Sequence, residues 1–405
     1  MKKLFVVMII LVWSSIPTHA LADTGLTKPW SILGYFDGEN AELERICEYN
    51  INQLEEVDSP FANISAVYDR PYKKTRDSTV RIYDIKKDND RNRIHSQSIS
   101  MGERDMGNPE VLDEFLSGYL GNKNILIVKS HGWGIIPGFS RVGYNSPQDP
   151  LLISKVLKKR LKQPLELLIF DSCNMASVEV AYQFKGLVSV MVASQDLMHY
   201  SMDAATHYTY SSRPGIDYEG LVSKLRPNSN AITIGKDVVN DFIEIISNKD
   251  AMYYKSTMSA TDLKSLNIDL FKIHAQTLIK GLESEKTRND YLYALKFTLD
   301  NANHFKPLGR YRLMTYYDVA DFFSTLESVL KTPFEIPRLG IIQSYSNNFI
   351  RKASGLSVLF FKDLSRISEQ RKQNMYDKYS ASRFAMDTGW DRLIETYHRF
   401  ANTYN

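Results

Sequence analysis

Short, unbroken apolar runs alternate with longer segments of helical periodicity through the first half of this chain. Asn124–Lys129 and Leu165–Phe170 are such runs; neither alternates apolar with polar residues. Strands of this composition are buried on both faces, as happens in a mostly parallel sheet that helices cover on either side. The pattern therefore predicts an α/β sandwich. The other strands expected in this half are Trp30–Phe36, Ala62–Tyr68, Thr79–Ile85 and Val188–Ala193.

Helical segments dominate the second half. The helices expected there are Gly220–Leu225, Ala231–Ser247, Ala260–Gly281, Asn289–Ala302, Tyr316–Leu330 and Trp390–Asn402, with one returning strand at Gly355–Phe361. The turn-forming residues Arg213, Pro214 and Gly215 separate the two patterns. We therefore expect an α/β domain over residues 23–214 and a mainly helical C-terminal region over residues 215–405 that packs on it.

The first 22 residues have the pattern of a removed signal peptide. Lys2 and Lys3 precede the apolar run Leu4–Trp13, and Ala20 and Ala22 form the small-x-small motif of a cleavage site. This run is shorter than the roughly 20 residues that a membrane-spanning helix needs. We expect a chain exported to the periplasm or beyond, without a membrane anchor.

Charge and composition exclude some classes of protein. Without residues 1–22, which carry two lysines and no acid, 48 basic residues face 47 acidic ones. Such a balance argues against nucleic-acid binding, which usually requires a strongly basic face. A hydrophobic fraction of 43% supports a packed globule rather than a disordered chain. We expect a monomer.

The chain contains only two cysteines, Cys47 and Cys173. Cys47 lies on a helical stripe with Leu43 and Ile51, so core packing is its natural interpretation. Cys173 instead follows a predicted strand. The two could form a disulfide with each other, or one or both could be free.

Cys173 and His131 each lie just beyond the carboxyl end of an apolar strand, where ligand sites of parallel sheets occur. A nucleophilic cysteine needs a base, and the imidazole pKa of about 6.5 suits proton transfer at neutral pH. A following helix would favour the thiolate through its dipole. The backbone N–H groups of Gly132 and Cys173 could form an oxyanion hole. The alternative is a structural cysteine and an unrelated loop histidine.

Two motifs carry a resemblance to a known family. Ser130-His131-Gly132 and Asp171-Ser172-Cys173-Asn174-Met175 resemble the active-site motifs of the clostripain family, secreted bacterial cysteine peptidases of the caspase-like clan. The similarity runs from about Trp30 to Tyr397. Further matching segments are Met106–Glu110, Ser177–Tyr182, Val192–Asp196, Gly355–Ser357 and Thr388–Asp391.

The resemblance implies a caspase-like α/β/α sandwich in which His131 and Cys173 form a catalytic dyad with no obligatory third member. In this clan the histidine acts mainly on the leaving group. Family members are commonly zymogens cleaved between the histidine and the cysteine, which here suggests self-cleavage at Arg141, with Lys155 and Lys158 as alternatives. No cofactor is required. Calcium is a possibility carried by the resemblance only, because the chain has no acidic loop of the EF-hand type.

Asp171 is the candidate for substrate specificity. A carboxylate two residues before the nucleophile could pair with an Arg or Lys before the scissile bond (P1), and the family's preference for basic P1 residues implies the same. The alternative is that Asp171 caps the following helix. Gln195 departs from the family by replacing an acid, and Asp203 is the candidate second acid of the pocket.

His199 and His207 could suggest a metal site, but no cluster of Cys, Asp and Glu accompanies them, so we expect no metal. These features together predict a secreted cysteine endopeptidase that cleaves protein or peptide substrates after Arg or Lys. The alternatives are a catalytically silent binding module on the same fold and a peptide ligase that uses the same acyl-enzyme.

Overall fold

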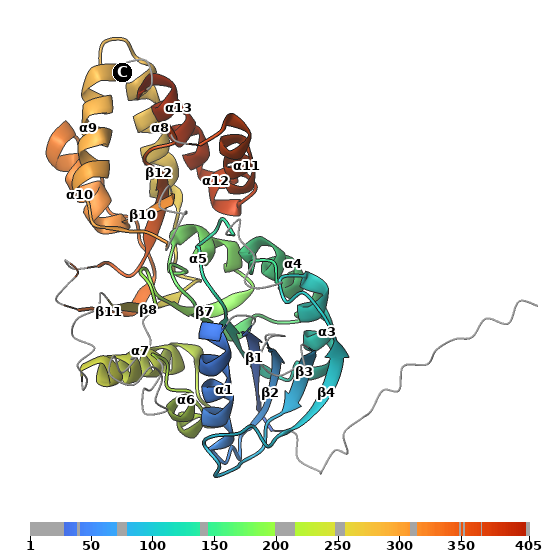
Figure 1. The fold of residues 1–405 in the computed structure, drawn as a ribbon. Helices are drawn as coiled ribbons and strands as arrows, with labels where there is room; N and C mark the ends of the chain where they lie inside the picture. The colour runs from blue at the N-terminus through green and yellow to red at the C-terminus, as the bar shows by residue number, and fades with distance from the viewer. Residues whose placement is uncertain are drawn as a thin grey trace, which may run out of the picture.

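The computed structural model describes residues 28–38, 41–70, 79–137, 145–198, 215–247, 256–307, 314–347, 350, 353–365 and 367–401. Its centre is a nine-stranded mixed sheet with the strand order β11-β8-β7-β6-β5-β1-β2-β3-β4 (Figure 1). The strands are β1 (Trp30–Asp37), β2 (Ala62–Asp69), β3 (Val80–Asp84), β4 (Gln97–Gly102), β5 (Lys123–Lys129), β6 (Leu165–Asp171), β7 (Val188–Ala193), β8 (Thr257–Asp262) and β11 (Ile341–Ser346).

The five inner strands from β7 to β2 are parallel, and the strands at both edges run antiparallel to their neighbours. Alternate side chains of β5 enter different hydrophobic clusters, with Ile125 and Ile127 on one face and Leu126 and Val128 on the other. Both faces of the strand are therefore buried, which explains its unbroken apolar sequence.

Helices cover both faces of the sheet, so the predicted α/β sandwich is confirmed (Figure 1). One face carries α1 (Ala41–Glu55), α6 (Tyr218–Lys224) and α7 (Ala231–Ser247). The other carries α3 (Pro109–Tyr119), α4 (Pro150–Arg160) and α5 (Val178–Phe184). Asn108 caps α3 by accepting a hydrogen bond from the Glu110 N–H, and proline follows at the first helical position, where its missing N–H costs nothing.

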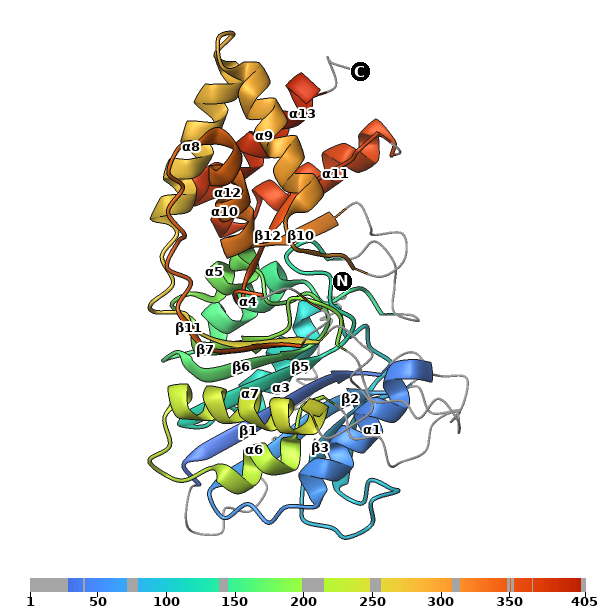
Figure 2. The same cartoon turned by 90° about the vertical axis from the view of Figure 1, so that its left-hand side faces the viewer.

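A second, three-stranded antiparallel sheet lies on the α5 side of the molecule, away from α6 and α7 (Figures 1 and 2). It consists of β12 (Ser357–Phe361), β10 (Met314–Asp318) and β9 (His304–Phe305). The helices grouped with it are α8 (Asp269–Glu283), α9 (Arg288–Asn301), α10 (Val319–Leu330), α11 (Glu369–Ser380), α12 (Arg383–Thr388) and α13 (Trp390–Ala401). Helix α12 and strand β12 pack directly on α5.

The second half contains more strand than its pattern predicts. The helix expected over residues 260–281 begins only at Asp269, and residues 257–262 are β8; likewise residues 314–318 are β10, before the helix α10. Strand β11 was not predicted. Because β8 and β11 complete the central sheet, the expected boundary at residue 214 does not divide the sheet from the C-terminal region. Both strands are rich in Ser and Thr, so they lack the apolar signal of the inner strands.

Within the described residues, no helix is both long enough and apolar enough to cross a bilayer. Residues 1–22, the predicted signal peptide, lie outside this part of the chain.

Candidate active site

Strands β5 and β6 bring His131 and Cys173 to the same edge of the sheet. The two strands pair in parallel, and the last matched positions are Lys129 and Asp171. His131 and Cys173 each lie two residues beyond that pair, and both side chains are half-buried. The two residues predicted to carry the chemistry therefore share the carboxyl edge of neighbouring central strands.

Gly132 packs directly on the backbone of Cys173. A Cβ atom at this glycine would clash with the Cys173 carbonyl oxygen and would lie 2.7 Å from the Cys173 nitrogen. Only glycine permits this approach without movement of one of the two loops. The contact joins the loop that carries His131 to the residue that carries the sulfur, and it places the backbone of Gly132 beside that of Cys173.

The thiol of Cys173 accepts a hydrogen bond from the backbone N–H of Met198, with Sγ and N 3.2 Å apart. Burial raises the pKa of this thiol to about 11; the hydrogen bond lowers the pKa, while the charges of Asp196 and Asp171 raise it further. In this conformation the sulfur is therefore a protonated thiol at neutral pH.

Helix α5 does not begin at Cys173, which corrects the expectation that its dipole lowers the thiol pKa. The helix starts at Val178, and its N-cap is Ser177, whose side chain accepts from the Val180 N–H. The effect of a helix dipole fades within a turn. For the same reason Asp171 is not the cap of this helix, and that alternative is wrong.

The residue after the cysteine adopts a left-handed conformation. Asn174 has φ 55°, a region in which Asn is one of the few tolerated residues. Its side-chain amide donates to the carbonyl of Gln195 over 2.9 Å, and its backbone N–H donates to the carbonyl of Asp196 over 3.0 Å. The cysteine loop is thus tied to the end of β7.

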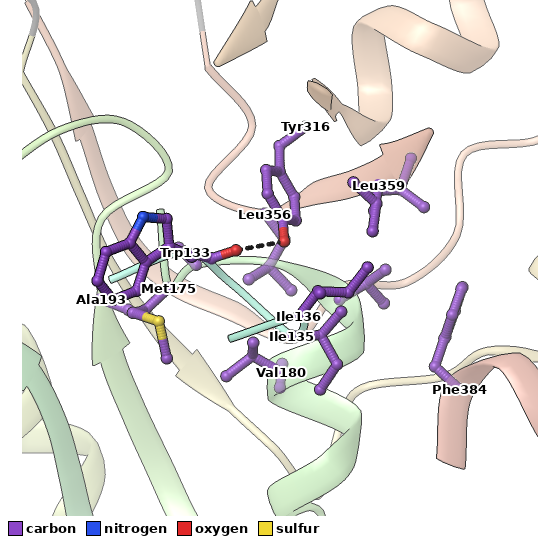
Figure 3. Packing of buried hydrophobic residues seen from close by; sticks show 14 of the residues in the cluster. Trp133, Ile135, Ile136, Met175, Val180, Ala193, Tyr316, Leu356, Leu359 and Phe384 are labelled. Carbon is purple, nitrogen blue, oxygen red and sulfur yellow. Dashed lines mark hydrogen bonds between the residues drawn. The ribbon is translucent and has the colours of Figure 1, made fainter. Parts of the chain in front are cut away.

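The histidine loop is held by a tyrosine from the C-terminal part of the chain. The hydroxyl of Tyr316, on β10, donates to the carbonyl of Trp133 over 2.7 Å (Figure 3). The ring centroids of Trp133 and His131 lie 5.8 Å apart. Gly134 has φ +74°, and a Cβ there would clash with the phenol of Tyr316. This tyrosine therefore fixes the chain just beyond His131.

The cysteine loop has a matching support from the same region. The backbone N–H and the hydroxyl of Ser357, at the start of β12, both donate to the carbonyl of Ala176, over 3.0 and 3.1 Å. Leu356, next to Ser357, lies in the hydrophobic cluster that also contains Met175 and Trp133 (Figure 3). Both active-site loops therefore depend on residues beyond position 300.

Asp171 is fully buried and is already paired. Its Oδ2 atom lies 2.6 Å from the Nζ atom of Lys129, and it accepts a hydrogen bond from the Tyr218 hydroxyl over 2.7 Å. Neither Lys129 nor Asp171 has an exposed side chain. The sequence suggested a carboxylate open to a basic substrate side chain, whereas this one has a lysine beside it.

Gln195, which replaces an acid of the family pattern, turns toward the C-terminal region. Its amide donates to Oδ2 of Asp318 over 3.1 Å and its oxygen accepts from the Gly355 N–H over 3.0 Å. It thereby joins β7 to the connection before β12.

Other predicted residues lie outside the described part of the chain, namely Arg141, His199, Asp203 and His207. Lys155 and Lys158 are exposed on α4. Cys47 is buried, and both cysteines are free thiols rather than a disulfide. Among the described residues no three His, Cys, Asp or Glu side chains group in a way that could hold a metal ion.

Sequence reasoning missed Lys129, Tyr218 and Tyr316. Lys129 ends an otherwise apolar strand, and a lysine is rarely buried unless it is paired, so the sequence did contain a signal for a buried ion pair. The two tyrosines had no such signal, because their contacts join segments 47 and 183 residues apart.

A free, half-buried thiol packs against a glycine backbone and shares the carboxyl edge of a largely parallel sheet with a histidine, which is the arrangement of a cysteine hydrolase.

Comparison with known proteins narrows that class. Residues 34–397 match the model of the clostripain family. Clostripain of Hathewaya histolytica is 25% identical over 455 residues, which cover 92% of this chain and 81% of clostripain. Two solved structures each cover 90% of this chain and 99% of their own. They are an inactive zymogen C11 protease from Parabacteroides distasonis (TM-score 0.58, 14% identity) and a secreted C11 cysteine protease from Bacteroides thetaiotaomicron in complex with an irreversible peptide inhibitor (TM-score 0.56, 15% identity).

The chain belongs to the clostripain family. It is a cysteine peptidase, and its α/β sandwich is the caspase-like fold of that family.

Proposed function

We propose that this protein is an exported endopeptidase in which Cys173 is the nucleophile and His131 is its partner in proton transfer. The sulfur attacks the carbonyl carbon of the scissile bond, and the thiol proton passes by way of the imidazole to the leaving amine. The resulting thioester is then hydrolysed by water, which releases the acid and restores the thiol. The N–H groups of Gly132 and Cys173 stabilise the oxyanion.

One observation carries this assignment: the backbone of Gly132 lies against that of Cys173 at the ends of two paired strands. The contact supports a shared oxyanion site because it sets the two backbones side by side, with His131 directly before the glycine. The pKa of the thiol is raised to about 11, so a base must remove the proton as substrate binds, and His131 is the residue we propose for this role.

We also propose that the chain is a zymogen that cleaves itself after Arg141. This residue lies between His131 and Cys173, as the processing sites of the family do. Lys155 and Lys158 are poorer candidates because they lie within helix α4. A peptidase that binds extended chain would have to unfold that helix first.

The basic P1 preference has less support than the peptidase activity. It was predicted from Asp171 as an open carboxylate and from Asp203. Asp171 is paired with Lys129, and Asp203 lies outside the described residues. We therefore propose the peptidase without a preference for Arg or Lys.

The activity is tested with a peptide library that varies the P1 residue. Cys173→Ala should reduce hydrolysis more than a thousandfold, since loss of a nucleophile removes the covalent route. Cys47→Ala is the matched control, because it removes the other thiol, which is fully buried on helix α1, and should retain activity. In the same preparations the wild-type chain should be cut after Arg141 and Cys173→Ala should stay intact.

If the wild-type chain does not cut itself, an added protease is used to cut it after position 141. Absence of peptide hydrolysis by this cleaved chain would indicate a silent binding module instead of a peptidase. Equal processing of wild type and Cys173→Ala would contradict self-cleavage alone.

A further inference from the structure

A buried ion pair lies directly behind the proposed nucleophile. Lys129 and Asp171 are the last paired positions of β5 and β6, and both are fully enclosed. The ammonium and carboxylate groups are 2.6 Å apart, and the Tyr218 hydroxyl donates to the same carboxylate oxygen. The surrounding cluster on this face of the sheet is apolar and includes Cys47 and Phe36.

The register of the strands builds this pair. Side chains at matched positions of parallel strands point to the same face, so a lysine at position 129 faces the residue at position 171. In apolar surroundings a single charge is strongly unfavourable, whereas two opposite charges in contact compensate each other. The pair is therefore neutral as a unit, and Asp171 has little capacity left for a third charged group.

Asp171 is also the residue whose position, two before Cys173, suggests recognition of a basic P1 side chain. The place at its carboxylate that such a side chain would take is filled by Lys129. We propose that Lys129 is an internal counter-ion that determines specificity, so that the enzyme prefers an uncharged residue before the scissile bond of a separate substrate. Self-cleavage after Arg141 proceeds against this preference, because a bond within the same chain reacts at a high effective concentration. This inference rests on the proposed peptidase function of Cys173.

The neighbouring described residues also favour an uncharged P1 residue. Both polar atoms of the Gln195 side chain are engaged, by Asp318 and by the Gly355 N–H. Met198, whose N–H contacts the sulfur, is an apolar residue. Asp196 is the other acid whose charge acts on Cys173, and this residue is only 7% exposed.

The test uses P1 pairs that differ in charge and little in shape. Arginine is compared with citrulline, and lysine with norleucine, in otherwise identical peptides. The processed wild-type enzyme should show a kcat/KM at least tenfold higher for the uncharged member of each pair. Lys129→Met should invert the preference, because Asp171 then lacks its counter-ion and can pair with a substrate guanidinium; the citrulline-to-arginine ratio should fall at least a hundredfold.

A neutral double variant, Lys129→Met with Asp171→Asn, controls for packing. It removes both charges while keeping similar side-chain volumes, so it should fold and should keep the uncharged preference. If Lys129→Met alone does not fold, the citrulline-to-arginine ratios of kcat/KM for the wild type and the double variant still test whether Lys129 determines the preference.

The outcomes separate the two proposals. A wild-type enzyme that prefers arginine to citrulline overturns the role of Lys129 and leaves the peptidase intact. A double variant that prefers arginine also overturns it, since the charge must then come from elsewhere. No hydrolysis of any peptide, with no labelling of Cys173 by a thiol-directed peptide inhibitor, defeats the proposed function itself.

Discussion

At the scale of single residues, two backbone positions hold the site together. Gly132 allows its loop to touch the backbone of Cys173, and Asn174 turns the chain back through a left-handed conformation directly after the sulfur. Neither residue needs to act through an ionisable side chain. The left-handed conformation of Asn174 is retained because the surrounding hydrogen bonds compensate for its strain.

Gly132→Ala should abolish most of the activity, because the new methyl group must displace the backbone of Cys173 and spoil the oxyanion site. We expect a loss of about 10²–10³-fold in kcat/KM, as for removal of one oxyanion donor. Gly118→Ala is the matched control: a Cβ at this helical glycine meets nothing within 4 Å. That control should retain full activity and gain about 0.5–1 kcal/mol of stability in denaturant unfolding. An active Gly132→Ala enzyme would contradict the importance of this contact.

At the scale of elements, strands β10 and β12 act as supports for loops that belong to β5 and β6. Tyr316 on β10 holds the carbonyl of Trp133, and Ser357 on β12 holds that of Ala176. These hydrogen bonds set the position of the loops rather than the chemistry of the site. The C-terminal region thus belongs to the framework that positions the candidate active site, rather than being an appended domain.

Tyr316→Phe should therefore reduce catalysis more than stability. Loss of one buried hydrogen bond costs about 1 kcal/mol of unfolding free energy. Displacement of the histidine loop should also lower kcat by about tenfold, within the ~10²-fold that a shift of about 1 Å can cause. Tyr317→Phe is the matched control, since that hydroxyl is equally buried and donates to the carbonyl of Leu299, away from the site. Equal losses of kcat in the two variants would refute a positioning role for Tyr316.

At the scale of the whole molecule, one core joins both halves of the chain. A single hydrophobic cluster includes residues of α3, α4 and α5 as well as the C-terminal helices and β12. Strands β8 and β11 also cover the side of β7, which would otherwise be an open edge of the central sheet.

The protein should consequently unfold in one transition, with equal calorimetric and van't Hoff enthalpies, because neither half has a complete core. Residues 23–214 expressed alone should not form a soluble folded domain, since the edge of β7 and the buried face of α5 would be exposed. Two separate calorimetric transitions, or a folded 23–214 fragment, would show that the predicted boundary is a true domain boundary.

Much of the inner sheet could be predicted because the apolar composition of its strands is visible in the local sequence. A strand buried on both faces must be apolar throughout, so β5 and β6 are recognisable from composition, and the residues that follow them can be placed at one edge. His131, Gly132 and Cys173 could be assigned in this way. Strands β8 and β11 could not be predicted, since their sequences lack a continuous apolar run and their strand partners are set only when the sheet forms.

Local periodicity and the order of the motifs were sufficient to predict the α/β class. They also predicted which edge of the sheet carries the candidate site and that Cys173 lies at this edge. The tertiary structure alone decided which charges and hydroxyls surround that edge. The pairing of Lys129 with Asp171 follows from strand register, and the contact of Tyr316 with Trp133 from packing across 183 residues. Register and long-range packing depend on the whole fold, because a residue's partner is set by where other segments lie and not by its own neighbours in the chain.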